Sequence, residues 1–162
     1  MGFLIKENSS CLFLRVPDYK NYNSIEEHIK KINEYGYVWM VKLGKYPRRN
    51  YLKLFMQDGG ILILKTSPKY NNKYYVFKVS SLIPENELII PNYYKYLFKD
   101  EGYDISMLKS THLWLRLDWY KEISEDILNN YVTLSTKNKF SNAILHSRAP
   151  LIYGISLKQF EL

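Results

Sequence analysis

Cysteine is nearly absent from this chain, in which Cys11 is the only one among 162 residues. A single cysteine excludes an internal disulfide, and within an apolar stretch it is expected to pack as a small hydrophobe. No run of about 18 apolar residues occurs, so no membrane-spanning helix is expected. The apolar stretch at the start is too short and weak for a secretory signal. These absences favour a cytoplasmic protein.

Signatures of catalysis and metal binding are also missing. His28, His112 and His146 lie far apart and have no cysteine or carboxylate at ligand spacing, so neither a metal site nor a cofactor is expected. The chain contains no GxxxxGK[ST] loop, no nucleophile elbow and no paired carboxylates that stand out. We therefore expect a binding domain and not an enzyme. A small catalytic or nuclease protein is the alternative.

Positive charge and tyrosine are abundant instead. The net charge is +7, from 23 basic and 16 acidic residues, which favours a polyanionic partner. Sixteen tyrosines supply rings with an apolar face and a hydrogen-bonding tip, which suit a wet binding surface. The length and a hydrophobic fraction of 46% predict one domain, residues 1–162, with a sizeable core.

Short strands with a few helices at their joints are predicted along the chain. Ser24 and Glu27 match a capping box, and Gly36 ends the helix that follows. The pattern predicts an α+β fold, a mixed and mainly antiparallel β-barrel with peripheral helices. Strands are expected over 11–16, 37–43, 61–65, 74–82, 113–123 and 150–157, helices over 24–36 and 47–56, short helical segments after Pro91 and Ser124, and polar segments without regular structure over 67–73, 99–110 and 138–148.

The longest expected strand runs from Leu113 to Ile123. Successive side chains of a strand point to opposite faces. One face carries every second residue from Leu113 and includes Trp119, which is therefore expected in the core. The other face carries Trp114 and Arg116, and Trp114 is a candidate for contact with a ligand.

Four segments, in order along the chain, carry a family resemblance: Tyr37-Val38-Trp39, residues 59–82, Leu115 to Trp119 (LRLDW), and residues 146–155 (HSRAPLIYGI). Together they resemble the PUA-like superfamily, in particular its EVE and YTH branch. The opening half also resembles the N-terminal targeting domains of archaeal McrB-type restriction proteins. The resemblance implies a PUA-like, EVE/YTH-type barrel.

The same resemblance implies a base-binding pocket with aromatic walls. Trp39 matches the family's first wall. The second wall usually comes from the loop before the Asp-Trp strand, and that loop offers Tyr93 and Tyr94 and no tryptophan. Trp114 is a further candidate. Aromatic walls can hold a modified base that has left its helix.

Cations near these aromatic residues are expected to contact phosphates. Arginines are favoured because a guanidinium group clamps a phosphate through two hydrogen bonds. The candidates are Lys42, Lys45, Arg48 and Arg49, which form the densest cluster, Lys69 and Lys73 in a hairpin loop, and Arg116 and Arg148.

We therefore expect a module that recognises DNA, in particular modified DNA, for a McrB-type restriction system. The missing phosphate loop means that the GTP-hydrolysing motor would follow this segment in a longer protein, and a nuclease subunit would be its partner. The alternative is an RNA-binding EVE-, YTH- or ASCH-type protein in RNA modification or translation, because phosphates are alike in DNA and RNA.

Overall fold

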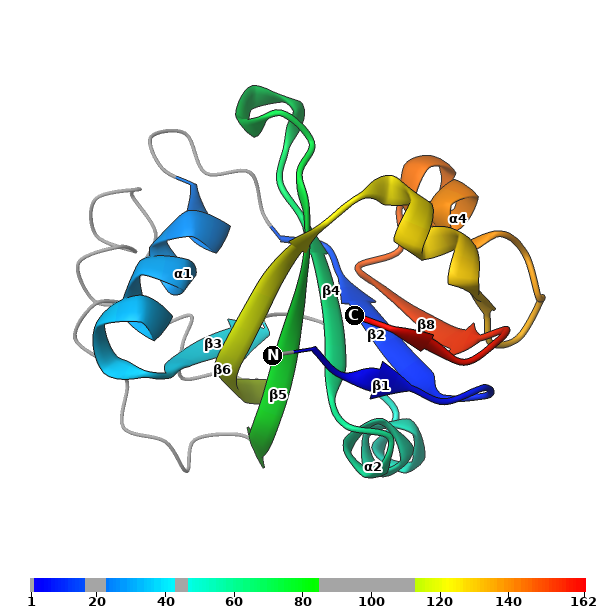
Figure 1. The fold of residues 1–162 in the computed structure, drawn as a ribbon, viewed down its shortest axis with the longest axis horizontal. Coiled ribbons are helices and arrows are strands. Elements are labelled where there is room, and N and C mark those ends of the chain that lie inside the picture. Colours follow the sequence, from blue (N-terminus) through cyan, green and yellow to red (C-terminus); the bar gives the residue numbers. More distant parts are fainter. Residues whose placement is uncertain (1, 17–22, 43–46, 85–112) are drawn as a thin grey trace.

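One seven-stranded sheet dominates the computed structural model, which describes residues 2–16, 23–42, 47–84 and 113–162 (Figure 1). The strand order is β3-β6-β5-β4-β2-β8-β7, and β1 and β9 form a separate antiparallel pair. The strands are β1 (Leu4–Ile5), β2 (Ser10–Leu14), β3 (Val38–Lys42), β4 (Ile61–Lys65), β5 (Tyr74–Pro84), β6 (Leu113–Ile123), β7 (Tyr131–Thr133), β8 (Leu151–Ser156) and β9 (Phe160–Glu161). The helices are α1 (Ser24–Tyr35), α2 (Arg49–Gln57) and α4 (Phe140–His146), with short 3-10 turns η1 (Pro68–Tyr70) and η3 (Glu125–Asn130).

The sheet is buried on both faces at its centre, which explains the unbroken apolar run of β4. Leu62 and Leu64 point into a larger core that α1 and α2 cover, whereas Ile61 and Ile63 point into a second core beneath η3 and α4. A strand buried on both faces reads as a continuous apolar run, because neither set of side chains meets water. The same two-sided burial accounts for Cys11, which is fully buried on β2 as expected.

The sheet curls around the larger core without closing into a barrel. That core includes Val38 from β3 and Leu151 from β8, which lie near opposite ends of the strand order. In the described part of the chain, however, β3 and β7 are edge strands and do not pair with each other. The α+β class is confirmed, and the expectation of a closed barrel is wrong. In a closed barrel the sheet itself would enclose the apolar surface. Here helices and short strands on the two faces of the open sheet cover that surface.

The first helix begins and ends through local capping. Gly36 adopts a left-handed conformation and donates its N–H to the carbonyl of Ile32, as expected for a helix end. The start differs from the prediction by one residue, because the side chain of Asn23 caps the helix by accepting a bond from the N–H of Glu26. Ser24 is therefore the first helical residue, and Glu27 pairs with Lys30 and not with a capping serine.

Four further elements were not predicted from the sequence. Residues 138–148 were expected to lack regular structure, but α4 forms there and buries Phe140 and Ile144. The short strands β1, β7 and β9 were also missed. The helix expected after Pro91 and the polar segment 99–110 lie outside the described residues. No helix in the described ranges has the length and apolar character needed to cross a membrane.

A bulge interrupts the long β5–β6 ladder and changes which residues share a face. Lys78 pairs with Trp119 and Val79 pairs with Leu117, so Asp118 has no partner opposite it. An extra residue in one strand reverses the alternation of side chains beyond it. Leu117 consequently lies in the larger core, whereas Trp119 packs against the second core and against the edge of Phe3. Trp119 was predicted to be a core residue on the face of Leu117; it is instead partly buried and packs against the core on the other face.

Two buried tyrosine hydroxyls contrast sharply. The hydroxyl of Tyr51 lies 2.5 Å from the carbonyl oxygen of Cys11 and 2.9 Å from that of Gly154, and so links α2 to the paired strands β2 and β8. The hydroxyl of Tyr131 is buried and has no hydrogen-bond partner among the described residues. Burial raises the pKa of both phenols, so both stay protonated. The first hydroxyl therefore stabilises the fold, and the second costs desolvation without compensation.

This contrast gives a matched pair of substitutions. Tyr131→Phe should raise the free energy of unfolding by about 1 kcal/mol, because it removes a buried donor that has no acceptor. Tyr51→Phe should lower it by roughly 1–3 kcal/mol, because two buried carbonyls lose their donor. Urea denaturation of both variants beside the parent measures the two effects. Destabilisation by Tyr131→Phe would show that its hydroxyl has a partner in solution.

His28 should make the protein sensitive to mild acid. It is buried on α1, and its Nδ1 donates to the carbonyl of Ser24 at 2.6 Å. Burial lowers the pKa of His28, although the Ser24 bond and the charge of Glu27 oppose the shift. An unfolded chain binds this proton near pH 6.5, so the folded state is penalised as pH falls below that value.

The free energy of unfolding should therefore fall as the pH drops below about 6.5, by at most about 1.4 kcal/mol per pH unit from this group. His28→Gln should remove that part of the slope. His146→Gln, at an exposed position, should keep it because His28 is still present. Urea titrations at several pH values measure the slope, and equal slopes in the parent and His28→Gln would exclude this role for His28.

Candidate nucleic-acid interface

The outer face of β3 and β6 gathers an arginine and two aromatic residues. Trp39 pairs with Arg116 across the antiparallel strands, so the two side chains lie on the same face. The Arg116 guanidinium stacks over the ring of Tyr37, 4.4 Å from its centroid. Trp39 is half-buried and Tyr37 is 40% exposed. We call Tyr37, Trp39 and Arg116 the β3–β6 face.

The opposite face of the same strands forms the core. Val38 and Met40 flank Trp39 and are buried in the larger core, as are Leu115 and Leu117 beside Arg116. Trp39 is therefore not part of that core. A residue that forms the wall of a binding pocket must lie outside the core in this way. A stacked guanidinium keeps its planar hydrogen-bond donors in a fixed orientation, which lowers the entropy lost when it binds an anion or a base edge.

Trp114, the other predicted pocket wall, is 1% exposed. It lies on β6 two residues before Arg116 and opposite Val41. A covered indole offers no surface on which a base can stack, so this structure does not place Trp114 on an open wall. Tyr93 and Tyr94, the candidates for the second wall, lie outside the described residues.

The predicted basic cluster does not form one surface. Arg48 and Arg49 are exposed at the start of α2, where the backbone N–H of Arg48 donates to the hydroxyl of Tyr153 at 3.0 Å. Lys42 is buried, and burial lowers its pKa, so it does not belong with the exposed cations. Lys45 lies outside the described residues. Of the four predicted cluster residues, the structure therefore places only Arg48 and Arg49 on an exposed surface.

The remaining candidate cations are dispersed. Lys69 lies over the ring of Tyr70 in the β4–β5 hairpin, which projects from the sheet (Figure 1). The Lys73 ammonium in the same hairpin lies 3.6 Å from the carboxylate of Glu122, so part of its charge is balanced within the protein. Arg148 is exposed between α4 and β8.

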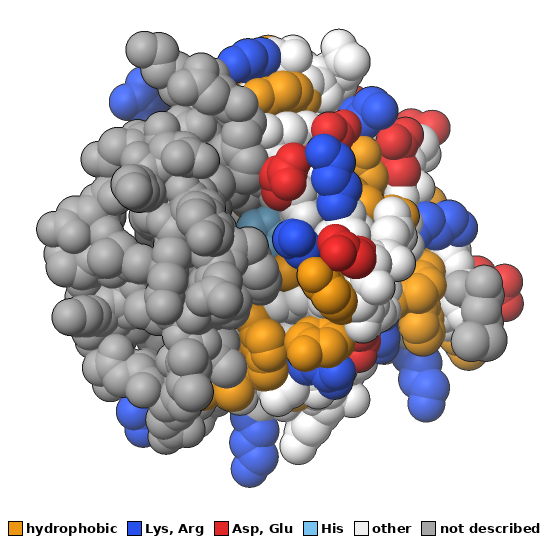
Figure 2. Space-filling view, turned by 90° about the vertical axis from the view of Figure 1, so that its left-hand side faces the viewer, with side chains coloured by type: hydrophobic (Ala, Val, Ile, Leu, Met, Phe, Trp, Pro, Cys, Tyr) orange, Lys and Arg blue, Asp and Glu red, His pale blue; other side chains and the backbone are white. Residues whose placement is uncertain are grey.

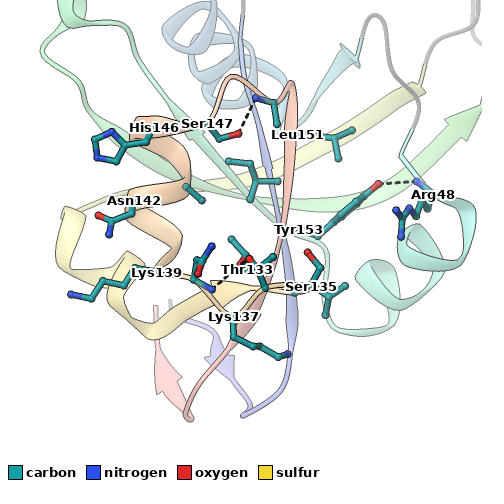
Figure 3. Close-up of a pocket in the computed structure, with 16 residues that line it drawn as sticks. Arg48, Thr133, Ser135, Lys137, Lys139, Asn142, His146, Ser147, Leu151 and Tyr153 are labelled. Carbon is teal, nitrogen blue, oxygen red and sulfur yellow. Dashed lines mark hydrogen bonds between the residues drawn. The ribbon is translucent and has the colours of Figure 1, made fainter.

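A polar groove that the sequence did not reveal brings Arg48 together with residues of the C-terminal third. α4 and the turn after β7 form one side, Arg48 stands on the other, and Tyr153 of β8 lies between them (Figure 3). The groove has a volume of about 900 Å³, and its cationic or titratable side chains are Arg48, Lys137, Lys139 and His146. We call it the basic groove.

The surface of α1 has a different charge character. Basic and acidic side chains intermingle there (Figure 2), and Lys30 pairs with Glu27 and Lys31 with Glu34. Such exposed pairs contribute little to stability, but they cancel the local field. The excess positive charge of the protein must therefore come from other surfaces.

Comparison of the chain with protein-family models, with curated proteins and with solved structures finds no match. Within the described ranges, no three His, Cys, Asp or Glu side chains gather in a way that could hold a metal ion. The candidate interface therefore rests on the β3–β6 face, the basic groove and the charge of the chain.

Proposed function

We propose that this chain is a nucleic-acid-binding recognition module of the PUA-like, EVE/YTH-related type. The observation that carries the proposal is the β3–β6 face, where the guanidinium of Arg116 is stacked on exposed Tyr37 beside half-buried Trp39. Aromatic rings stack on unpaired bases, and an adjacent guanidinium can contact either a base edge or a phosphate. The net charge of +7 supports a polyanionic partner.

The curled sheet supports the PUA-like part of the proposal. Its strands surround one core under α1 and α2, and the segments that carry the family resemblance fall on β3, on the β4–β5 hairpin, on β6 and on the end of α4 with β8. Trp39, the residue that matches the family's first aromatic wall, lies outside the cores. The proposal therefore retains Trp39 as the base-contacting residue and no longer relies on Trp114.

We further propose that the nucleic acid is DNA carrying a modified base, and that the module serves a McrB-type restriction protein with a GTPase motor and a nuclease subunit. An RNA-binding role is the alternative. A panel of matched DNA and RNA oligonucleotides, unmodified, methylated and hydroxymethylated, distinguishes them by fluorescence anisotropy. Tightest binding to modified DNA supports the restriction role, and tightest binding to RNA supports the alternative.

Trp39→Ala should weaken binding to the preferred oligonucleotide by roughly 1–3 kcal/mol, which is the usual scale for a lost base–aromatic stack. The loss should be larger for the modified substrate than for its unmodified counterpart, because the modification is what the aromatic wall contacts. Anisotropy titrations of the parent and the variant at one salt concentration measure both losses.

Met40→Ala is the matched control, because Met40 is buried on the core face of the same strand. It should lower the free energy of unfolding by about 2–5 kcal/mol, as truncation of a buried methionine does, and leave the affinity of the folded fraction unchanged. If folded Trp39→Ala binds every oligonucleotide as tightly as the parent, Trp39 is not a base-contacting residue and the proposed site is incorrect.

A further inference from the structure

Among the described residues, no carboxylate lines the basic groove, and the sequence explains why. No Asp or Glu occurs between Glu34 and Asp58, nor between Asp126 and Glu161, although the chain has 16 acidic residues. The first of these segments supplies Arg48, and the second supplies every other residue that lines the groove. The fold therefore places two acid-free segments face to face, and nothing within the groove balances its positive charge.

The cations of the groove are exposed and unpaired within the described residues. Arg48, Lys137 and Lys139 are all exposed, and none of them lies within 4 Å of a carboxylate in the described part of the chain. Bringing like charges together without a counter-ion raises the energy of the folded state. A bound anion would relieve that repulsion, so the arrangement favours a negatively charged ligand.

The walls of the groove are held by hydrogen bonds, so the cations stand on a fixed frame. The hydroxyls of Thr133 and Thr136 lie 2.7 Å apart, and Thr133 Oγ1 also accepts the N–H of Asn138 at 3.0 Å. At the C-terminal end of α4, the guanidinium of Arg15 donates to the carbonyls of Ile144 and Ser147 at 3.0 and 2.9 Å. A preformed frame reduces the ordering cost of binding.

The positions of the cations indicate an extended anion. A smaller hollow of about 550 Å³ adjoins the groove, shares Arg48, Leu134 and Tyr153 with it, and adds Arg49. Lys137, Lys139 and His146 stand on the α4 side and Arg48 on the α2 side, with the ring of Tyr153 between them (Figure 3). Arg49 follows Arg48 at the start of α2. Cations on both sides of two adjoining hollows suit a chain of phosphodiesters, which carries several negative charges along its length.

We propose that the basic groove binds the phosphodiester backbone of a nucleic acid, at a site separate from the β3–β6 face. This inference rests on the proposed function in taking nucleic acid as the polyanion. The two sites belong to opposite ends of the strand order, since the groove is built on β7 and β8 and the other face on β3 and β6. Backbone contacts position a nucleic acid without reading its sequence, so the groove would supply affinity.

Two pairs of Lys→Gln substitutions, which lower the net charge by the same amount, test the groove. Lys137→Gln with Lys139→Gln removes two groove cations, and Lys121→Gln with Lys158→Gln removes two exposed lysines that do not line it. Each protein is titrated with one duplex and one single-stranded oligonucleotide at several salt concentrations. Thermal unfolding of each variant checks that the substitutions leave the fold intact. Little change in stability is expected, because all four lysines are exposed.

The groove pair should reduce the magnitude of the log–log salt slope by up to about 1.8 on duplex DNA, and weaken binding at 0.1 M salt by roughly ten- to sixtyfold. Arg48→Gln with Arg49→Gln should give a similar loss, and the control pair should leave the slope nearly unchanged. Equal effects of the groove pair and the control pair would show that the groove does not bind the backbone. The proposed function would be unaffected, because Trp39→Ala tests it separately at the β3–β6 face.

Lysine acetylation of the unmodified protein gives a second readout that needs no variant. A bound oligonucleotide should protect Lys137 and Lys139 and leave Lys121 and Lys158 reactive, and equal reactivity of all four would overturn the groove. Binding to anionic phospholipid vesicles in place of oligonucleotides would overturn it as well. A parent protein that binds no polynucleotide at low salt would overturn the proposed function and the groove together.

Discussion

The hydroxyl of Tyr51 fixes the geometry on which the basic groove depends. It meets the carbonyls of Cys11 and Gly154, which are opposite each other on β2 and β8, so one side chain ties α2 to both strands. The Tyr51 ring also packs 4.1 Å from that of Tyr153. Tyr153 in turn accepts the N–H of Arg48. The exposed arginine is thus held through a short series of contacts that begins in the core, and its position follows from the strand pairing.

The β3–β6 face depends on a different constraint, the bulge at Asp118. Without it, alternation would place Trp119 beside Leu117 in the larger core, and Tyr120 on the face of Arg116. With it, Tyr120 packs against the larger core and donates to Asn33 of α1, while Trp119 turns to the second core. The bulge therefore separates the part of β6 that pairs with β3 and carries Arg116 from the part that carries Trp119 and Tyr120. Bulges commonly redirect side chains near binding sites in this way.

Local patterns predicted the strands well and the tertiary arrangement less well. The boundaries of β4 and β6 were predicted to the residue because both combine a dense apolar pattern with clear ends. α4 was missed because only Phe140 and Ile144, four residues apart, mark its buried side. The open sheet and the bulge depend on pairing between distant strands, which no local window contains. Lys139 and Arg48 line the same groove only because β8 lies between the segments that carry them, so neither segment alone predicts the candidate groove.

The strand order also has a consequence for how this chain must fold as it is synthesised. β2 lies between β4 and β8, and its antiparallel partner β8 begins only at Leu151. Until Leu151 has left the ribosome, the apolar strand β2 has an edge whose backbone groups are unpaired. Such an edge can pair with other chains. Contacts between residues so distant in sequence also form slowly, because the loop between them must be closed first. Gly154, whose missing side chain leaves room for Cys11 and Phe140, allows the late strand to enter a space that is already bounded on both sides.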